Sequence, residues 1–309
     1  MADFDLAPWT ALHTDALEVA LDAFLSPDAL CADGPVRPLG LVDAMRYAAM
    51  DGGKRLRPLL VIAAFEAAVG RPLTAQDGAV VRAACAVELI HAYSLVHDDM
   101  PCMDDDVLRR GKPTVHVQFG EAGALLAGDA LQTLAFALLT PEDGSVAPAL
   151  QGRLCGLLAR ASGCAGMAGG QAIDLDHVGK ALTEEALRHM HRCKTGALLE
   201  CSVRMGAVCG GADAHAQAQL AEFGRALGLA FQVVDDVLDV SADSVTLGKT
   251  AGKDAQNDKP TFVSLMGLAQ SRQYAQQLCE QAEQALARAG LADTSALSAL
   301  ARRVVQRSH

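Results

Sequence analysis

The sequence predicts an all-α protein. Of its 309 residues, 51% are hydrophobic but only 4% are aromatic, and much of the apolar content is alanine and leucine, which favour helices over strands. Long segments with helical periodicity alternate with short interruptions rich in Gly, Pro and Asp, and strand-like alternation is nearly absent. Helices this long and this apolar must pack mostly on one another, so residues 1–309 are interpreted as a single domain.

The expected helices follow from the apolar periodicity and from the residues that interrupt it. Pro58 marks the first turn of one helix, and Pro101 follows directly on the apolar run that ends another. A bundle of about ten or more helices is expected on this basis. In chain order, the helices lie near 10–25, 37–51, 57–69, 75–99, 121–139, 147–164, 183–208, 213–239, 261–289 and 294–305.

Composition and charge argue against several classes of protein. No run approaches roughly eighteen uncharged apolar residues, so no membrane span is expected, and the start MADFDLAPWT has neither a basic leader nor an apolar signal core. Nine scattered cysteines include no CxxC pair, which argues against a zinc ribbon and fits a reducing cytoplasm. A net charge of -11 argues against nucleic acid and anionic membrane surfaces as partners. A small anionic substrate remains compatible with this charge.

The stretch YSLVHDDMPCMDDDVLRRG, residues 93–111, places a first aspartate cluster at the end of an apolar helix. Burial of bare carboxylates there is costly, and the negative end of the helix dipole adds to the cost. Divalent cations relieve both penalties, because carboxylate oxygens suit magnesium. Asp98 and Asp104 are six residues apart, and a two-residue bulge at Pro101 can return Asp104 to the face of Asp98. The alternative is a solvated acidic loop.

A second aspartate cluster, FQVVDDVLDV at 231–240, repeats the pattern on another apolar helix. Asp235 and Asp239 share one face of that helix, whereas Asp236 lies about 100° around it. Two such clusters facing each other across a bundle would hold several magnesium ions. Because magnesium usually binds few carboxylates together with phosphate oxygens, the pattern predicts a polyphosphate substrate.

Basic residues flank both clusters. DGGKRLRPLL, at 51–60, places Lys54, Arg55 and Arg57 beside a Gly-Gly turn, which indicates either a phosphate cradle or a basic turn that caps a helix. Arg109 and Arg110 are adjacent and can reach two different phosphates.

Further lysines follow in KTGALLE, with Lys194, and in the loop GKTAGKDAQNDKPTF. This loop contains Lys249, Lys253 and Lys259 and suits a mobile lid, although Lys253 also fits a solvated loop residue. His91 lies seven residues before the first aspartate pair, where it fits either a ligand or a satisfied core histidine.

Six sequence blocks then identify a family. GGKRLRP, HAYSLVHDDMPCMDDDVLRRGKPT, GDALQTLAF, GGQAIDL, KTGALL and FQVVDDVLD occur in the order seen in trans-type (E-) polyprenyl diphosphate synthases. The chain resembles this family over residues 36–309, and most of all its bacterial members that make farnesyl diphosphate. The resemblance implies the isoprenoid synthase fold, with helices around a central active-site cavity, a homodimer, and magnesium as cofactor, about three ions per active site.

The resemblance also implies a reaction. Isopentenyl diphosphate condenses head-to-tail with dimethylallyl or geranyl diphosphate, through magnesium-assisted ionisation, condensation and elimination, to give (E,E)-farnesyl diphosphate. The alternatives are a geranylgeranyl diphosphate synthase and a non-catalytic subunit of a prenyltransferase. A terpene cyclase or a head-to-head synthase would not need the GGKRLRP block. Loss of aspartates from either motif would favour the non-catalytic subunit, but none of the expected ligands is lost. The one departure is Val107, where an aspartate is frequent in the family, and it lies beyond the expected ligand Asp104.

The resemblance implies a role for each matching residue. The expected magnesium ligands are Asp98, Asp99, Asp104, Asp235 and Asp239. Isopentenyl diphosphate would be bound by Lys54, Arg57, His91 and Arg110, and the allylic diphosphate by Arg109, Lys194, Lys249 and Lys259. Thr195 and Gln232 would lie near the reacting carbons. The implied catalytic set is Asp98, Asp104, Arg109, Lys194, Thr195, Gln232 and Asp235.

Tyr93 is the candidate for chain-length control. It lies about 7.5 Å before Asp98 along the helix, so its ring can form a floor beneath a growing hydrocarbon, unless it is only a core aromatic. In the family, an aromatic residue here together with the two-residue insertion is associated with farnesyl diphosphate. Arginines near the C-terminus, Arg302, Arg303 and Arg307, leave open a closing role for the tail.

Overall fold

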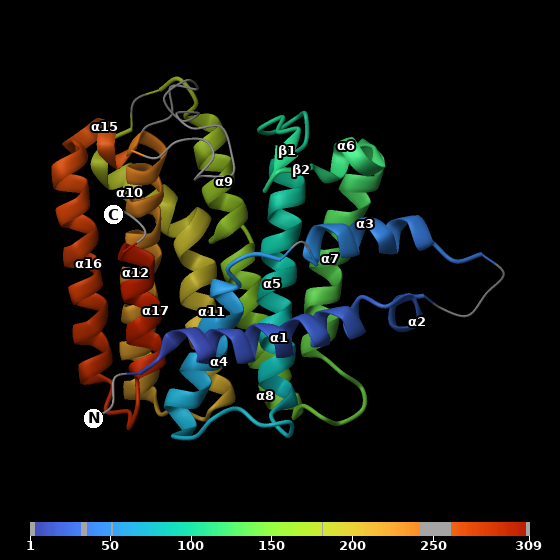
Figure 1. The fold of residues 1–309 in the computed structure, drawn as a ribbon, viewed down its shortest axis with the longest axis horizontal. Helices are drawn as coiled ribbons and strands as arrows, with labels where there is room; N and C mark the ends of the chain where they lie inside the picture. The colour runs from blue at the N-terminus through green and yellow to red at the C-terminus, as the bar shows by residue number, and fades with distance from the viewer. Residues whose placement is uncertain (1–3, 32–35, 51, 181, 242–260, 307–309) are drawn as a thin grey trace.

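The computed structural model describes residues 4–31, 36–50, 52–180, 182–241 and 261–306. Over these ranges the chain forms a bundle of α-helices with one short two-stranded hairpin, as Figure 1 shows. The all-α prediction is therefore confirmed.

The elements have the following bounds. The helices of the first half are α1 Leu6–Phe24, α2 Pro27–Leu30, α3 Leu39–Ala49, α4 Leu56–Val69, α5 Gly78–Asp98, α6 Val115–Phe119, α7 Glu121–Leu139 and α8 Pro148–Ser162. The helices of the second half are α9 Met167–Asp176, α10 Glu184–His191, α11 Ala197–Cys209, α12 Ala214–Ser241, α15 Phe262–Met266, α16 Leu268–Arg288 and α17 Ser295–Gln306. A π-helix, η1 Arg192–Gly196, joins α10 to α11, and strands β1 Leu108–Arg109 and β2 Lys112–Pro113 pair antiparallel.

Each predicted segment contains a helix, but two segments are divided. The π-helix interrupts 183–208, and Gly267, at φ +83°, separates α15 from α16 within 261–289. Helix α9 was not predicted, because glycines disfavour helix interiors. Gly169 and Gly170 occur there because added Cβ atoms would overlap the backbones of Cys164 and Lys194.

Helices α5 and α12 bring the two aspartate clusters to one end of the bundle. Helix α5 packs against α4, α7 and α11, and α12 packs against α11 and α16, so α11 contacts both. Their C-terminal ends lie uppermost in Figure 1. The first aspartate cluster begins at the last residue of α5 and the second lies in the last turns of α12, so the shared direction of these helices sets the place of the site.

Two helices, α5 and α7, are long and apolar enough to cross a membrane by length and composition alone. In α5, 67% of the apolar window is buried, and the helix carries Arg82 and Glu88, as expected for a core helix. In α7, 39% of the window is buried. Helix α7 carries Asp129 and leaves Leu125 and Leu126 exposed, so the part of the chain that the structure describes does not cover this apolar face.

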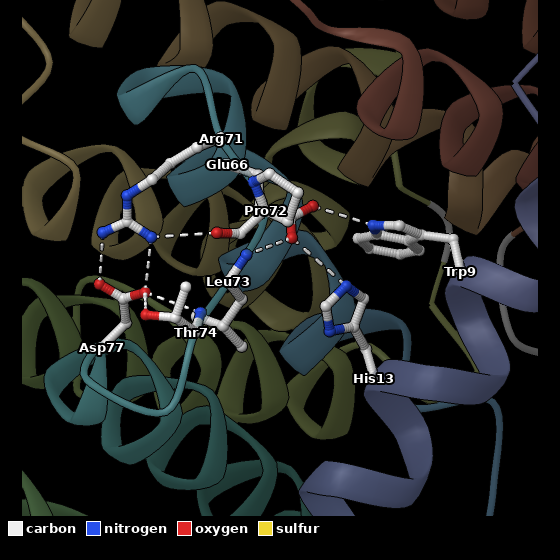
Figure 2. Close-up of polar contacts among 8 residues, drawn as sticks. All are labelled: Trp9, His13, Glu66, Arg71, Pro72, Leu73, Thr74 and Asp77. Carbon is white, nitrogen blue, oxygen red and sulfur yellow. Dashed lines mark hydrogen bonds and ion pairs between the residues drawn. The ribbon is translucent and has the colours of Figure 1, made fainter.

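A set of polar contacts remote from the aspartate clusters fastens α1 across α4. The Glu66 carboxylate accepts hydrogen bonds from Trp9 Nε1 at 2.9 Å and from the Leu73 amide at 2.8 Å, and it lies 3.4 Å from His13 Nε2 (Figure 2). Burial raises the pKa of Glu66, but the bonds from these three residues outweigh burial and hold that pKa below its usual value. These four residues are called the Glu66 clasp below.

The turn that follows α4 is fixed beside the clasp. The Arg71 guanidinium forms two bonds of 2.8 Å with the Asp77 carboxylate, and the Thr74 amide and hydroxyl also donate to Asp77 (Figure 2). The clasp and this turn together connect α1, α4 and the start of α5.

Candidate active site

Two neighbouring cavities lie where α5 and α12 end. One has a volume of about 420 Å³ and the other about 530 Å³. Arg57, His91, Arg110 and Phe231 line both cavities and so form the wall between them. The smaller, called the basic cavity, is also lined by Lys54, Arg55 and Arg303, and the larger, called the aspartate cavity, by Asp98 and Asp235.

The Gly-Gly turn gives the basic cavity its shape. Gly52 and Gly53 have φ of +70° and +125°, a conformation that side chains disfavour. The Arg110 guanidinium donates to the Gly52 carbonyl at 2.7 Å, and a Cβ at Gly53 would lie 2.8 Å from Arg110 Nη1. The glycines therefore allow this arginine to lie against the turn.

The two arginines of GGKRLRP have different surroundings. Arg55 is 3% exposed and is bonded to Glu18 at 2.7 Å, to Glu88 at 2.6 Å and to the Ala49 carbonyl at 2.8 Å, so the fold itself neutralises its charge. Arg57 Nε is buried and has no hydrogen-bond partner among the residues the structure describes, and burial lowers the Arg57 pKa. A bound anion would satisfy Arg57.

His91 lies in the wall between the cavities as a neutral imidazole. Burial, followed by the positive charges of Arg57 and Arg110, holds the His91 pKa well below its usual value. A neutral ring can donate one hydrogen bond to an anion without adding charge to a site already rich in cations.

The chain after α5 folds back on the helix end. The Asp104 amide donates to the Asp98 carbonyl at 2.9 Å, across six residues, and Asp105 adopts φ +49°. This is the bulge expected at Pro101, and it brings Asp104 near Asp98. Burial, opposed by Lys194 and reinforced by Asp104, raises the pKa of Asp98 to about 6. No described residue donates a hydrogen bond to the Asp98 side chain.

Arg109 and Arg110 diverge at the hairpin formed by β1 and β2, as predicted for two phosphates, but both have protein partners. Arg109 forms two bonds, of 2.7 and 2.6 Å, with the Asp99 carboxylate, while Arg110 reaches the Gly-Gly turn. Asp99 is buried and caps the end of α5. Arg109 also lines the aspartate cavity, so its guanidinium lies between Asp99 and that space.

Helix α12 contributes its aspartates in three different ways. Asp235 lines the aspartate cavity opposite Asp98. Asp236 is 2% exposed and Asp239 is 5% exposed, and Asp239 Oδ1 has no hydrogen-bond partner within the described ranges. Within the same ranges no group of three or more His, Cys, Asp or Glu side chains is placed to hold a metal ion.

The π-helix supplies Lys194 and Thr195 to the aspartate cavity. Glycines on both sides admit it, since a Cβ at Gly170 of α9 or at Gly228 of α12 would overlap its backbone. Lys194 Nζ forms an ion pair with Asp174 at 2.6 Å. Wider π-turns of this kind are rare and occur frequently at functional sites.

Tyr93 lines the same cavity, and a second aromatic ring supports it. The His97 ring meets the Tyr93 ring edge-on at 5.8 Å, and His97 Nε2 donates to the Leu125 carbonyl of α7 at 3.2 Å. A Cβ at Gly128 would overlap the imidazole. His97 is a weaker ligand candidate than His91 from the sequence, and its contact with Gly128 could not be predicted, because that contact joins two helices and leaves no local signal.

Some predicted site residues lie elsewhere. Lys249, Lys253 and Lys259 lie outside the described residues. Gln232 lines neither cavity, and its side chain accepts a hydrogen bond from the Thr195 hydroxyl at 3.0 Å. Residues that line the cavities but were not placed in the site beforehand include Phe231, Met103 and Met167, while Arg303 was considered only for a closing tail.

The arrangement agrees with comparisons to known proteins. The polyprenyl synthetase family matches residues 40–294. The chain belongs to this family. The resemblance to polyprenyl diphosphate synthases inferred from the six sequence blocks is therefore confirmed.

Individual members of the polyprenyl synthetase family match over most of the chain. Farnesyl diphosphate synthase of Escherichia coli (strain K12) is 47% identical over 94% of this chain and 94% of its own length. The chloroplastic heterodimeric geranylgeranyl pyrophosphate synthase large subunit 1 of Arabidopsis thaliana is 45% identical over 92% of this chain and 75% of its own. The crystal structure of a geranyltransferase from Helicobacter pylori, complexed with magnesium and isoprenyl diphosphate, has a TM-score of 0.82 at 31% identity and covers 99% of this chain and 98% of its own.

Proposed function

We propose that this chain is a prenyltransferase that condenses isopentenyl diphosphate with dimethylallyl or geranyl diphosphate to form (E,E)-farnesyl diphosphate. The observation that carries the proposal is the pair of cavities that share one wall. The basic cavity, which no aspartate of the described residues lines, suits a substrate that keeps its diphosphate group through the reaction. The cavity with facing aspartates suits a substrate whose diphosphate leaves.

The basic cavity is assigned to isopentenyl diphosphate. Lys54, Arg57, His91 and Arg110 would bind its diphosphate, and the buried, unbonded Arg57 Nε supports this assignment. The allylic diphosphate would lie in the aspartate cavity against Arg109 and Lys194. Lys249 and Lys259 belong to the same proposal on the family resemblance alone.

The aspartate cavity fits magnesium. Asp98, Asp99, Asp104, Asp235 and Asp239 would hold about three ions, and the donor set consists of the hard oxygen ligands that magnesium requires. Two observations support this fit, namely the buried Asp239 Oδ1 without a bond and the raised pKa of Asp98 among other carboxylates. The magnesium complex of the Helicobacter pylori relative also supports it. Bound magnesium would stabilise the negative charge that develops on the leaving diphosphate.

The protein's own groups would protect and orient the reacting carbons. The aspartate cavity is lined by Tyr93, Leu95, Met103, Met167 and Ala168, and such apolar side chains exclude water from an allylic carbocation. The Thr195 hydroxyl lies in the same wall, where its oxygen dipole can stabilise positive charge. The departing diphosphate would accept the final proton, so the proposal needs no side-chain base.

The product length is proposed from Tyr93. Tyr93 is 8% exposed, and its ring packs against the His97 ring, for which Gly128 leaves space between α5 and α7. This packing supports the role of Tyr93 as the floor of the cavity. The 45% identity to a geranylgeranyl pyrophosphate synthase subunit keeps the longer product as the second candidate.

A product assay tests both parts. Purified protein with magnesium, isopentenyl diphosphate and geranyl diphosphate should yield farnesol after dephosphorylation. Tyr93→Ala should shift the product towards geranylgeraniol, and Tyr93→Phe, which keeps the ring, should not. Geranylgeraniol from the unmodified protein would contradict the role of Tyr93 as the floor that limits product length. Absence of any prenyl product would contradict the proposed prenyltransferase activity.

The remaining proposals concern assembly and place. Residues 1–309 form one domain, which is supported by the family match over 40–294. A homodimer is supported by the outer face of α7, where Leu125 and Leu126 are 48% and 55% exposed. Leu126→Glu should convert a dimer to a monomer in sedimentation velocity. A cytoplasmic location is supported by nine cysteines without a disulfide among them.

A further inference from the structure

A chain of hydrogen bonds runs from the aspartate cavity to the start of α15. The Thr195 hydroxyl donates to Gln232 Oε1 at 3.0 Å, and Gln232 Nε2 donates to Asp236 Oδ1 at 3.2 Å. The backbone amide of Phe262 donates to Asp236 Oδ2 at 2.8 Å. The chain thus connects the π-helix, α12 and α15, and only Thr195 of these residues lines the cavity.

The carboxylate of Asp236 sets the direction of the whole chain. An ionised carboxylate accepts hydrogen bonds and cannot donate them, so the Gln232 amide must turn its NH₂ group towards Asp236. The amide oxygen then faces Thr195, and the Thr195 hydroxyl must donate to it. The two lone pairs of that hydroxyl are not used by this bond and can face the cavity.

Asp236 is well placed to hold this direction. It is 2% exposed, and Phe262, which bonds its second oxygen, is fully buried. The Phe262 ring packs on the His191 ring, with centroids 5.5 Å apart, and His191 ends α10 next to the π-helix. In contrast with its neighbour Asp235, Asp236 does not line the cavity among the described residues.

The geometry points to Asp236 as a positioning residue that fixes the polarity of the Thr195–Gln232 pair, so that the Thr195 oxygen presents a lone pair to the reacting allylic carbons. This role rests on the proposed prenyltransferase function. It separates the two adjacent aspartates of α12, since Asp235 faces the metal and substrate space while Asp236 acts through Gln232 and Thr195.

An amide at position 236 should reverse the polarity. The Asn side chain presents one acceptor and one donor group, so it cannot accept from both the Phe262 amide and Gln232. If its oxygen stays with Phe262, its NH₂ group meets Gln232, the Gln232 amide turns over, and the Thr195 proton points into the cavity. We expect Asp236→Asn to lower kcat about 100-fold, the size typical for loss of one preorganised dipole. Neither the KM for isopentenyl diphosphate nor the magnesium requirement should change.

The experiment compares Asp236→Asn with Asp235→Asn as the matched neighbour. Steady-state rates are measured against magnesium and each diphosphate. Asp235→Asn should raise the magnesium concentration for half-maximal rate, and Asp236→Asn should leave it unchanged. A comparable rise in both variants would make Asp236 a metal-site residue and overturn the inference.

A double-mutant cycle with Thr195→Val tests the connection itself. In the unmodified background, Thr195→Val should lower kcat, whereas in the Asp236→Asn background it should add little, because the lone pair is already misdirected. Multiplicative effects would mean a merely structural role for Asp236 and would overturn the inference.

Gln232→Leu provides a second route if Asp236→Asn does not fold. It removes both hydrogen bonds of Gln232 without changing either aspartate. It should show the same coupling to Thr195→Val, with an unchanged dependence of the rate on magnesium. Independent effects of Gln232→Leu and Thr195→Val would overturn the inference. Failure of the proposed function is distinguishable, because the unmodified protein would then form no prenyl product at all.

Discussion

Two carboxylates away from bulk solvent, Glu66 and Asp98, have opposite surroundings. Glu66 accepts hydrogen bonds from Trp9 and Leu73 and lies beside His13, and its pKa is lowered. Asp98 lies at the negative end of α5, and its pKa is raised to about 6 even though Lys194 and Arg109 act in the other direction. The first carboxylate is satisfied by the fold, and the second is not.

The difference indicates where the protein gives up native-state stability to keep a carboxylate available for binding. A satisfied carboxylate stabilises the native state, whereas a buried carboxylate without donors destabilises it until a cation arrives. Strongly raised or lowered pKa values of this second kind cluster at functional sites. In this account the Glu66 clasp holds α1 on the bundle, and the Asp98 carboxylate is kept available for a metal ion.

The largest expected effect is on catalysis at Asp98. Asp98→Asn should lower kcat about 1,000-fold, since loss of a metal-site carboxylate removes transition-state stabilisation of several kcal/mol. Steady-state kinetics at saturating substrates and magnesium measure it. Glu280→Gln, an exposed change on α16, is the control and should keep the rate. A loss of kcat under tenfold in Asp98→Asn would contradict the proposed role of Asp98 in binding a catalytic metal ion.

Next in size is the stability effect at Glu66. Glu66→Gln turns an NH₂ group towards donors that need an acceptor, so it should lower the free energy of unfolding by about 2–3 kcal/mol. Urea denaturation measures this value. The kcat should stay within about twofold, because the clasp is remote from both cavities. A large kcat loss in a folded Glu66→Gln protein would show that the two regions are coupled.

A smaller change in the free energy of unfolding is expected at Asp98, and here the substitution should stabilise the protein. Its folded pKa of about 6 lies above the unfolded value near 3.9, so the native state binds a proton that the unfolded state has lost between these pH values. Stability therefore falls as pH rises from about 4 to 6, and the penalty is complete above that. Asp98→Asn without metal should be about 1–2 kcal/mol more stable at pH 7.5, a gain that disappears near pH 4. Equal stability at both pH values would contradict this assignment.

The opposite pH dependence is expected for the clasp. The folded pKa of Glu66 is lowered, so its stabilisation is present above the unfolded pKa and is lost as pH falls through the folded pKa. Trp9→Phe removes one of the hydrogen bonds to Glu66 and keeps an aromatic, though smaller, side chain, so it should cost about 1 kcal/mol at pH 7.5. Thermal melts of Trp9→Phe against the unmodified protein at two pH values check this, and an equal deficit in strong acid would indicate lost packing instead.

Several features of the fold and site could be predicted from local signals. Helical periodicity located the main helices, and the spacing of Asp98, Pro101 and Asp104 predicted the bulge that the bond between Asp104 and Asp98 closes. The meeting of Asp98 and Asp235 in one cavity also followed, because each ends a long apolar helix.

Other features depend on contacts between distant segments and could not be predicted. The pairing of Arg109 with Asp99 is set by the hairpin geometry, and no spacing rule indicates it. Gly128 resembles any helical glycine until His97 lies against it. The π-helix depends on glycines of two other helices, Gly170 and Gly228, which admit its wider backbone.

The availability of Asp98 for a cation is tested most directly by melting the unmodified protein and Asp98→Asn, each with and without magnesium and inorganic diphosphate. We expect Asp98→Asn to melt higher without ligands, and we expect magnesium and diphosphate together to raise the melting temperature of the unmodified protein much more than that of the variant. An equal rise in both proteins, or a lower melting temperature of the ligand-free variant, would contradict the claim that the fold leaves Asp98 unsatisfied in order to bind a cation.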